Sequence, residues 1–298
     1  MLEFPPAATA TELAAEKPRT LGILAGGGTL PAQVARAARA AGRDVFIVGL
    51  DGFAERAVLA EWPHEIIRMG AAGRILATLR AHDCQDIVLI GPVRRPSLLD
   101  MRPDAEGARI LARVGRAAFA GDDGLLAAVI RVLGEEGFQV IGAHEVLRAP
   151  LAPGGVLTRV APDAQALADI ARGVAVVRAL GRVDVGQGCV VQQGIVLAVE
   201  AAEGTDAMLA RVAPLRRDGP GGVLVKLVKP GQDRRADLPT VGPQTVRCAA
   251  AAGLRGVAFE AGGTILAESE ATIAAADAAG LFLLGLDPGT IPEGSEGE

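Results

Sequence analysis

The sequence predicts an α/β protein of two domains, an N-terminal Rossmann-like domain with a parallel sheet and a C-terminal mixed α/β domain. The chain has 298 residues, enough for about two domains of ordinary size. Half of its residues are hydrophobic and only 3% are aromatic, which is typical of small-residue helices packed on parallel strands. Short apolar runs alternate with helical patterns along the chain, as in repeated βαβ units.

Residues 20–150 carry the pattern of the Rossmann-like domain. Four short apolar runs bounded by turn residues predict strands, at 21–26, 44–50, 65–70 and 86–93. Helical periodicity between the runs predicts helices, at 30–42, 72–83 and 121–137. We expect residues 138–147 to form a further strand and a short turn.

A change of composition separates the two halves of the chain. Residues 149–162 hold three prolines and two glycines in fourteen residues, so we interpret 151–162 as a linker between the domains. We place the C-terminal domain at 163–288, a flexible N-terminal extension at 1–19 and a disordered tail at 289–298.

Strand and helix patterns alternate again in the second half. Residues 188–201 predict a hairpin whose strands meet near Gln193 and Gly194, and 222–229 predict a strand that ends in a polar segment. The remaining predicted elements are a helix at 163–181, a helix and strand at 243–262, and a helix and strand at 269–287.

Charge and composition exclude several classes of function. A net charge of −5 and a pI of about 5.4 do not suit nonspecific nucleic-acid binding, which requires a basic stripe. No apolar run has the length of a membrane span, and the first nineteen residues lack the features of a signal peptide, so we expect a cytoplasmic protein. Three cysteines and three histidines form no ligand pattern, so any metal should be Mg²⁺ or Mn²⁺ held by carboxylates.

A glycine run lies between the first predicted strand and helix. Its backbone amides and the helix N-terminus predict an anion or nucleotide site, and Asp51 follows the second strand as a ribose-binding acid would. Pro31 departs from the dinucleotide fingerprint and also suits a plain tight turn before a helix. The candidate binding residues are Gly26, Gly27, Gly28, Thr29 and Leu30.

Two groups of acidic residues follow turns. Asp122 and Asp123 open a predicted helix, where capping explains one carboxylate and leaves the second as a site candidate. Residues 198–209 place acids beside two small residues at a strand end, and helix capping by the threonine is the alternative interpretation. The candidates in this second group are Glu200, Glu203, Gly204, Thr205 and Asp206.

The densest polar stretch follows the strand at 222–229. Residues 226–237 contain six charged side chains in twelve positions, among prolines and glycines that favour an irregular loop. Lysine and arginine suit phosphate oxygens, whereas carboxylates suit a hard divalent cation or a water nucleophile. A solvated surface loop is the alternative. The candidates are Lys226, Lys229, Gln232, Asp233, Arg234, Arg235, Asp237 and Thr240.

Four motifs in this order resemble the UDP-2,3-diacylglucosamine pyrophosphatase family of lipid A biosynthesis, in the form unrelated to the calcineurin-like enzymes. They are "GILAGGGTLP", "GDDGLL", "AVEAAEGTD" and "KLVKPGQDRRADLPTVGPQTV". The resemblance implies two α/β domains with the lipid substrate between them. It also implies Mg²⁺-dependent hydrolysis of the diphosphate, by attack of water on the β-phosphorus, to UMP and 2,3-diacylglucosamine 1-phosphate.

The resemblance also implies roles for the candidate residues. Its essential aspartate lies in the lysine- and aspartate-rich loop and matches either Asp233 or Asp237; we favour Asp233, which follows the flexible step at Gly231 and Gln232. Lys226 and Lys229 are the other catalytic candidates. Candidate metal ligands are Asp233, Asp237, Glu200, Glu203 and Asp206. The remaining candidates bind substrate: Gly26, Gly27, Gly28, Thr29, Leu30, Asp122, Asp123, Gly204, Thr205, Gln232, Arg234, Arg235 and Thr240.

The expected partners follow from this substrate. A lipid-linked UDP-sugar implies peripheral association with the cytoplasmic surface of the inner membrane, no nucleic acid and a possible homodimer. Two other functions are alternatives to hydrolysis. One is a nicotinamide-dependent oxidoreductase of Rossmann type, which Pro31 disfavours. The other is a nonenzymatic nucleotide-sugar sensor, which leaves the acids of the polar stretch unexplained.

Overall fold

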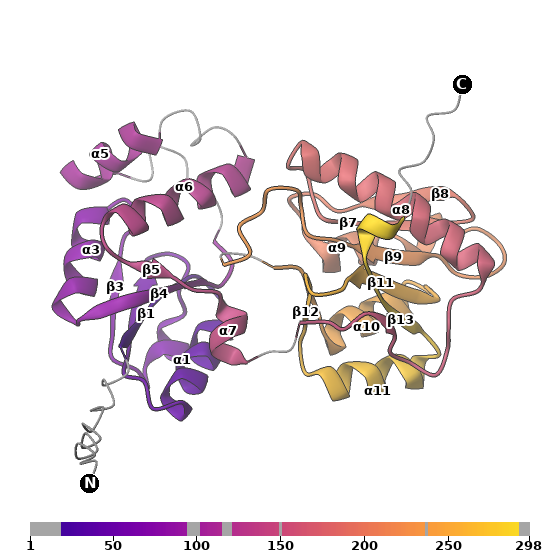
Figure 1. Cartoon of the computed structure of the whole chain (residues 1–298), viewed down its shortest axis with the longest axis horizontal. Helices are drawn as coiled ribbons and strands as arrows, with labels where there is room; N and C mark the ends of the chain where they lie inside the picture. The colour runs from indigo at the N-terminus through magenta and orange to yellow at the C-terminus, as the bar shows by residue number, and fades with distance from the viewer. Residues whose placement is uncertain (1–18, 94–101, 115–120, 149–150, 236–237, 292–298) are drawn as a thin grey trace, which may run out of the picture.

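The chain forms two α/β domains that lie side by side (Figure 1). The computed structural model describes residues 19–93, 102–114, 121–148, 151–235 and 238–291. The N-terminal domain ends with the helix α7 (Ala143–Leu147), and the C-terminal domain begins within the segment that follows it.

A five-stranded parallel sheet forms the core of the N-terminal domain, with the order β3-β2-β1-β4-β5. Alternating residues of β1 enter two different clusters: Leu21 and Ile23 pack with α1, whereas Leu24 packs against the cluster that contains α3 and α6. Helices therefore cover both faces of the sheet, as the sequence predicts. The strands are β1 (Thr20–Ala25), β2 (Val45–Leu50), β3 (His64–Ile67), β4 (Cys84–Ile90) and β5 (Gln139–Val140). The helices before α7 are α1 (Leu30–Ala40), α2 (Arg56–Leu59), α3 (Ala72–Ala81), α5 (Ala105–Val114) and α6 (Gly121–Glu135).

The order of this sheet reverses between β1 and β4. β2 and β3 follow β1 on one side, and β4 and β5 lie on the other. In open α/β sheets the crevice beyond the carboxyl ends of the strands at such a point is the usual ligand site. The glycine run after β1 and Gly91 after β4 lie at this point.

The C-terminal domain has a six-stranded mixed sheet in the order β6-β13-β11-β9-β7-β8. Its three central strands are parallel, and β6, β7 and β8 add antiparallel edges. The strands are β6 (Gly155–Val156), β7 (Gly188–Gln192), β8 (Ile195–Val199), β9 (Val223–Lys226), β11 (Gly256–Glu260) and β13 (Phe282–Leu286). A separate pair joins β10 (Thr240–Val241) to β12 (Ile265–Leu266).

Helices cover the two faces of this sheet unequally. The long helix α8 (Ala164–Arg182) packs on one face, where its Val174 and Val177 share a cluster with Val223 and Val225 of β9. The other face carries α9 (Thr205–Ala210), α10 (Pro243–Ala251) and α11 (Ser269–Ala279), which pack around Leu224 of β9. The core of this domain therefore has two layers, one on each side of β9.

The segment 151–162, which we interpreted as a linker, contributes to the C-terminal sheet. Ala152 is buried and donates its amide to Thr264 O, and Gly155 and Val156 pair antiparallel with β13. Prolines and glycines suit an edge strand this short, because only one side of it needs ladder hydrogen bonds. Part of the proposed tail is also ordered: a 3₁₀ turn spans Pro288–Thr290, and 292–298 lie outside the described residues.

The predicted hairpin is confirmed, and a buried carboxylate holds its turn. Gln193 and Gly194 both have positive φ, as a two-residue hairpin turn requires. Asp169 of α8 is buried and accepts the amides of Gln193 at 3.0 Å and Gly194 at 2.7 Å. One side chain thus ties the helix to the turn between β7 and β8.

Asp169→Ala is expected to destabilise the C-terminal domain by about 1–3 kcal/mol, because the turn loses two hydrogen bonds to a charged group that is itself buried. Urea unfolding of the purified chain, followed by circular dichroism, measures this loss. A change below about 0.5 kcal/mol, the range of ordinary surface substitutions, would show that the carboxylate does not support the turn.

Candidate functional site

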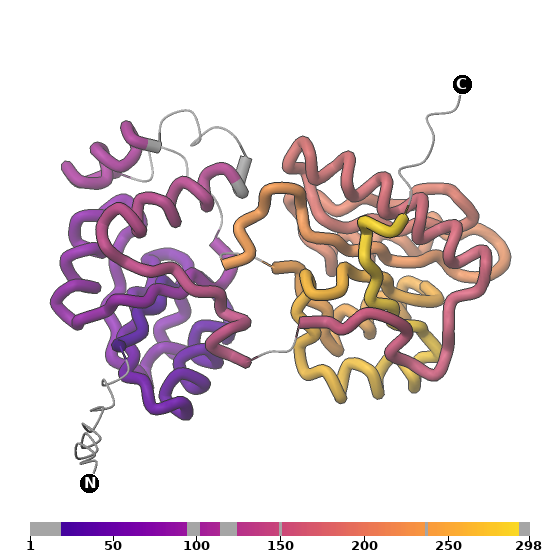
Figure 2. The backbone as a smooth tube through the Cα atoms, in the orientation of Figure 1, coloured from indigo at the N-terminus to yellow at the C-terminus, as the bar shows by residue number. Residues whose placement is uncertain are grey.

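The polar stretch begins where two parallel strands of the C-terminal domain end together. Lys226 closes β9 and pairs in register with Phe259, so Glu260 ends β11 at the same edge of the sheet. Residues 227–239, here called the polar loop, connect β9 to β10. Figures 1 and 2 show this loop leaving the C-terminal domain in the direction of the N-terminal domain. The candidates at the start of the polar stretch therefore lie at the carboxyl edge of the sheet, where α/β proteins place their ligands.

The two lysines of the stretch point to opposite faces of the sheet. Lys229 Nζ lies 2.6 Å from Asp184 Oδ1, just beyond the C-terminus of α8. Lys226 Nζ instead donates to Thr205 Oγ1 at 2.7 Å, at the start of α9. Since α8 and α9 cover different faces, the polar loop straddles the sheet edge and the two ammonium groups do not converge.

Glu260 organises the near part of the polar loop. Its Oε2 accepts the Val228 amide at 3.2 Å, and its Oε1 lies 3.0 Å from the Arg234 guanidinium. The sequence analysis missed this residue. The sequence contained a signal for Glu260, because it is the polar residue that ends a buried strand. The ends of parallel strands meet at one edge of a sheet, and this strand is parallel to β9.

A cavity of about 260 Å³ opens beside the loop on the α8 side. Among the described residues that line it, Arg178, Lys229 and Arg234 are cationic and Glu260 is the one carboxylate. Arg178 donates to Pro288 O at 2.7 Å, which joins α8 to the segment after β13. An excess of cationic groups around a hollow suits phosphate oxygens.

Asp233 is held by its neighbour Arg235. The guanidinium makes two contacts with the carboxylate, Nε to Oδ1 at 2.9 Å and Nη2 to Oδ2 at 2.6 Å. The Arg235 side chain and then its backbone amide lower the pKa of Asp233, against an opposing effect of burial. Asp233 is therefore a carboxylate with a bidentate cationic partner.

Arg235 also connects the loop electrostatically to the N-terminal domain. Its pKa is raised, first by the hydrogen bond to Asp233 and in smaller part by the charge of Glu145 on α7. Glu145 itself accepts the Gly142 amide at 2.8 Å, which fixes its carboxylate at the start of α7. Arg235 of the C-terminal domain is therefore close enough to Glu145 of the N-terminal domain for the carboxylate charge to affect its pKa.

A second group of candidates gathers around Lys226, on the α9 side of the sheet. Thr205 Oγ1 lies 2.7 Å from Glu200 Oε1 as well as from Lys226 Nζ, and Thr240 O lies 3.5 Å from the same ammonium. Gly204 has a φ of 80° and precedes α9 as its N-cap. The hydroxyl of Thr205 does not cap the helix, as the sequence left open, but bridges two buried charged groups.

The described members of the proposed metal-ligand set make separate contacts. Glu203 pairs with Arg211 at the surface, and Asp206 contributes to raising the pKa of Cys248 on α10. Within the described ranges, no three side chains of His, Cys, Asp or Glu are close enough to hold an ion. Asp237 lies outside the described residues, and so do the side chains of Asp122 and Asp123, whose backbone opens α6.

The glycine run of the N-terminal domain packs closely against the end of β4. A Cβ on Gly26 would lie 2.5 Å from Gly91 O, so the close approach of the two loops requires glycine. The amides of Gly27 and Gly28 donate to Pro92 O and Glu55 Oε1. Thr29 precedes α1 without a side-chain cap, and Leu30, the first helical residue, is 42% exposed.

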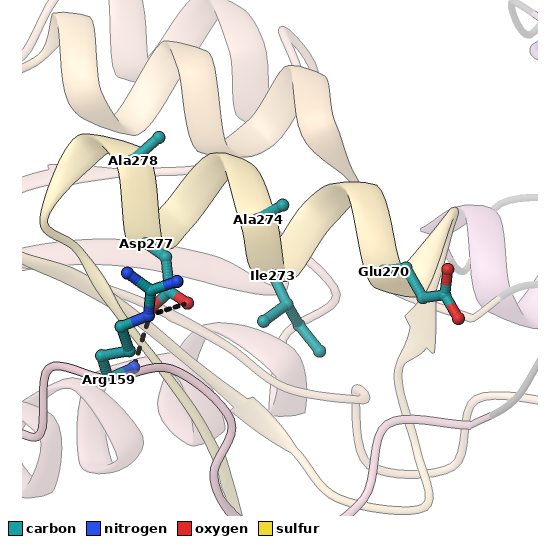
Figure 3. A pocket seen from close by; sticks show the side chains of 6 residues that line it. All are labelled: Arg159, Glu270, Ile273, Ala274, Asp277 and Ala278. Carbon is teal, nitrogen blue, oxygen red and sulfur yellow. Dashed lines mark hydrogen bonds and ion pairs between the residues drawn. The ribbon is translucent and has the colours of Figure 1, made fainter.

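A larger hollow of about 470 Å³ lies along α11, away from the polar loop (Figure 3). Its lining combines Ile273 and two alanines with Glu270 and an ion pair between Arg159 and Asp277. The figure shows the guanidinium of Arg159 turned to Asp277 while Glu270 lies at the other end of the helix. These polar groups do not converge on one point, so this hollow is the weaker candidate for a site.

A search of the helices in the described residues finds none with the length and apolarity to span a bilayer.

Comparison with known proteins matches both domains to one family. The LpxI N-terminal domain matches residues 20–149 and the LpxI C-terminal domain matches residues 153–284. The UDP-2,3-diacylglucosamine pyrophosphatase LpxI of Caulobacter vibrioides is 45% identical over 276 residues, covering 91% of this chain and 98% of that protein. A solved structure of glycinamide-RNase-transformylase T from Mycobacterium tuberculosis is 14% identical, with a TM-score of 0.24 over 62% of this chain and 44% of that one, a likeness too weak to support any inference.

Arg235→Gln is expected to raise the pKa of Asp233 toward its ordinary value near 3.8, because the substitution removes the main cause of the lowering. NMR titration of ¹³C-labelled carboxyl groups measures this. In the parent chain the ion pair stabilises the fold above the pKa of unfolded aspartate, and this stability is lost as pH falls through the lower folded value. The variant should therefore be less stable than the parent near neutral pH, and the two should be equally stable in strong acid. An unmoved Asp233 titration would show that the pair does not form in solution.

Proposed function

This chain belongs to the LpxI family, and we propose that it hydrolyses the diphosphate bond of UDP-2,3-diacylglucosamine, releasing UMP and 2,3-diacylglucosamine 1-phosphate. The observation that carries the proposal is the 45% identity to a protein named for this activity, over 98% of its length. The polar stretch, which lies within the matched C-terminal domain, carries the most specific of the motifs that resemble the family.

The charges of the polar loop support a diphosphate as the substrate group. Arg178, Lys229 and Arg234 face one cavity, so phosphate oxygens there would replace contacts that these cations make with protein oxygens. Hydrolysis of a diphosphate gains most from cationic groups that meet the charge developing on the transferred phosphoryl group. We assign the nucleotide part to the crevice at the glycine run, where the sheet order reverses.

Among the described carboxylates, we assign Asp233 the role of accepting a proton from the attacking water. Arg235 binds both of its oxygens, and a diphosphate is a competing partner for the same guanidinium. Transfer of Arg235 to a phosphate oxygen would free an Asp233 oxygen to accept a proton from water. The reaction then proceeds by attack of that water on the β-phosphorus, with UMP as the leaving group. Asp237 stays an alternative for the same role.

The proposal includes Mg²⁺, or Mn²⁺ in its place. Mg²⁺ commonly binds through one or two carboxylates together with substrate phosphates, so a cluster of three protein ligands is not required. Asp233 and Asp237 are the residues that would hold it; Glu200, Glu203 and Asp206 are dispersed and do not form a shared site. When bound, the ion would neutralise charge on the phosphate oxygens.

The substrate also places the protein at a lipid surface. A diacylated sugar stays in a bilayer, so we propose peripheral association with the cytoplasmic face of the inner membrane. Flotation with vesicles that contain the substrate's product, 2,3-diacylglucosamine 1-phosphate, tests this association. A homodimer is a further proposal, which light scattering of the purified chain tests.

Asp233→Asn is expected to lower kcat about 10²–10⁴-fold, the usual loss for a general base, with little change in KM. Turnover of UDP-2,3-diacylglucosamine, followed by release of UMP, measures this. Glu270→Gln on α11 is the matched control, because it removes an exposed carboxylate that lines the other hollow and not the cavity beside the loop, so kcat should stay unchanged. Near-parental kcat in Asp233→Asn, together with a large loss in Asp237→Asn, would move the role to Asp237.

Removal of divalent cations with EDTA should abolish turnover, and added Mg²⁺ or Mn²⁺ should restore it. The physical reason is that a divalent cation shared between the phosphates and one or two carboxylates would neutralise charge on the phosphate oxygens during attack. Metal analysis of the treated protein is the necessary control. Full turnover by demonstrably metal-free protein would refute the metal requirement and leave the hydrolase proposal standing.

A further inference from the structure

We propose that Glu200, Thr205 and Lys226 form a buried positioning unit that fixes the base of the polar loop and, through it, the place of Asp233. In this proposal the unit acts through the loop and not on substrate, which replaces the catalytic, metal-binding and substrate-binding roles expected from the sequence for its three residues. Its effect on turnover rests on the hydrolase activity proposed above, but its effect on the loop itself does not.

Three polar side chains form the unit in an apolar setting. Lys226 and Glu200 are each 6% exposed, and the hydroxyl of Thr205 lies between them, 2.7 Å from Lys226 Nζ and 2.7 Å from Glu200 Oε1. A buried charge is costly unless it is paired and hydrogen-bonded. The threonine supplies the link, since the ammonium and the carboxylate make no direct ion pair.

The direction of the hydrogen bonds follows from the groups themselves. An ammonium can only donate and an ionised carboxylate can only accept. Thr205 Oγ1 must therefore accept from Lys226 and donate its single hydrogen to Glu200. A serine can reproduce this arrangement, whereas a valine of similar shape cannot.

The ammonium also bridges the two ends of the polar loop. Lys226 is the last residue of β9, before the loop begins, and Thr240 is the first residue of β10, after the loop ends. Lys226 Nζ lies 3.5 Å from Thr240 O, a longer contact than the one to Thr205. The side chain of Lys226 thus joins the strand before the loop that carries Asp233 to the strand after it.

The backbone around Glu200 is shaped to admit its carboxylate. A Cβ on Gly188 would lie 2.5 Å from Glu200 Oε2, and a Cβ on Gly186 would lie 1.9 Å from Glu200 O. Oε2 is buried and has no hydrogen-bond partner among the described residues. Such an arrangement is a poor source of stability, because well-packed apolar side chains of similar volume often stabilise a core better than a buried ion pair. We therefore assign it to positioning.

The experiment compares Thr205→Val, Thr205→Ser and Glu200→Gln with the parent chain. For each variant we would measure kcat, KM, melting temperature and hydrogen exchange of the loop amides between 228 and 235. Thr205→Val and Glu200→Gln are expected to raise loop exchange and to lower kcat about tenfold or more, because a displaced reacting group loses rate steeply. KM should change less than kcat. Thr205→Ser should retain both parental values.

Asp169→Ala is the matched control. Asp169 is another buried carboxylate of the same domain, and it holds the β7–β8 turn rather than the polar loop. This variant should lose stability while its kcat and loop exchange stay parental. The double variant of Thr205→Val with Glu200→Gln should be no slower than the worse single one, since both changes break the same unit.

Parental loop exchange in both Thr205→Val and Glu200→Gln would overturn the proposal. So would a loss of kcat in Thr205→Ser as large as that in Thr205→Val, because the hydroxyl would then not be the link. If the parent chain itself does not release UMP, the proposed function fails, and the exchange measurements still decide whether the unit fixes the loop.

Discussion

The parallel pairing of β9 with β11 is the constraint on which the candidate site depends. It places the ends of two buried strands side by side, so that Lys226 and Glu260 reach the same edge of the sheet. Each anchors a different part of the polar loop: Lys226 precedes the loop and contacts Thr240 directly after it, and Glu260 binds Val228 and Arg234 within it. A slip of one residue between the strands would turn these side chains to the opposite faces and separate the anchors.

The sheet edge divides the charges of the polar loop into two environments. On the α9 side, Lys226 is buried and linked through Thr205 to Glu200, where few ligand atoms could reach it. On the α8 side, Lys229 and Arg234 border an open cavity. Charged groups in the first environment can hold the loop in place, while those in the second can meet an anion. The sequence alone does not distinguish the buried Lys226 from Lys229, which lines the cavity.

The sequence predicted the fold class because its signals are local. Apolar runs and helical periods identify strands and helices wherever burial is regular, and the turn at Gln193 and Gly194 is set by two adjacent residues. The short strand β6 escaped because its pairing with Leu284 joins residues more than a hundred positions apart, and its own composition resembles a linker. Propensity alone cannot reveal a pairing that tertiary contacts create.

The same division between local signals and long-range contacts applies to the site. The position of the polar stretch after a buried strand was visible in the sequence. The structure brings Thr205 and Thr240 to the ammonium of Lys226, with Glu200 bound to Thr205. The partners Asp184, Glu260 and Arg178 were missed, because each comes from a distant element and gains its place only when the sheet assembles. The dispersal of Glu203 and Asp206 could not be foreseen for the same reason: a run of acids on a turn sends neighbouring side chains in different directions.

A crystal structure of this chain with a methylene-bridged analogue of UDP-2,3-diacylglucosamine would test the central claim most directly. The analogue keeps both phosphates and cannot be hydrolysed at the bridge. The account predicts that its phosphonate oxygens lie within hydrogen-bonding distance of Lys229, Arg234 or Arg235, with Lys226 still bound to Thr205. Phosphonates bound away from the polar loop, or seated on Lys226 with the Thr205 contact broken, would contradict it.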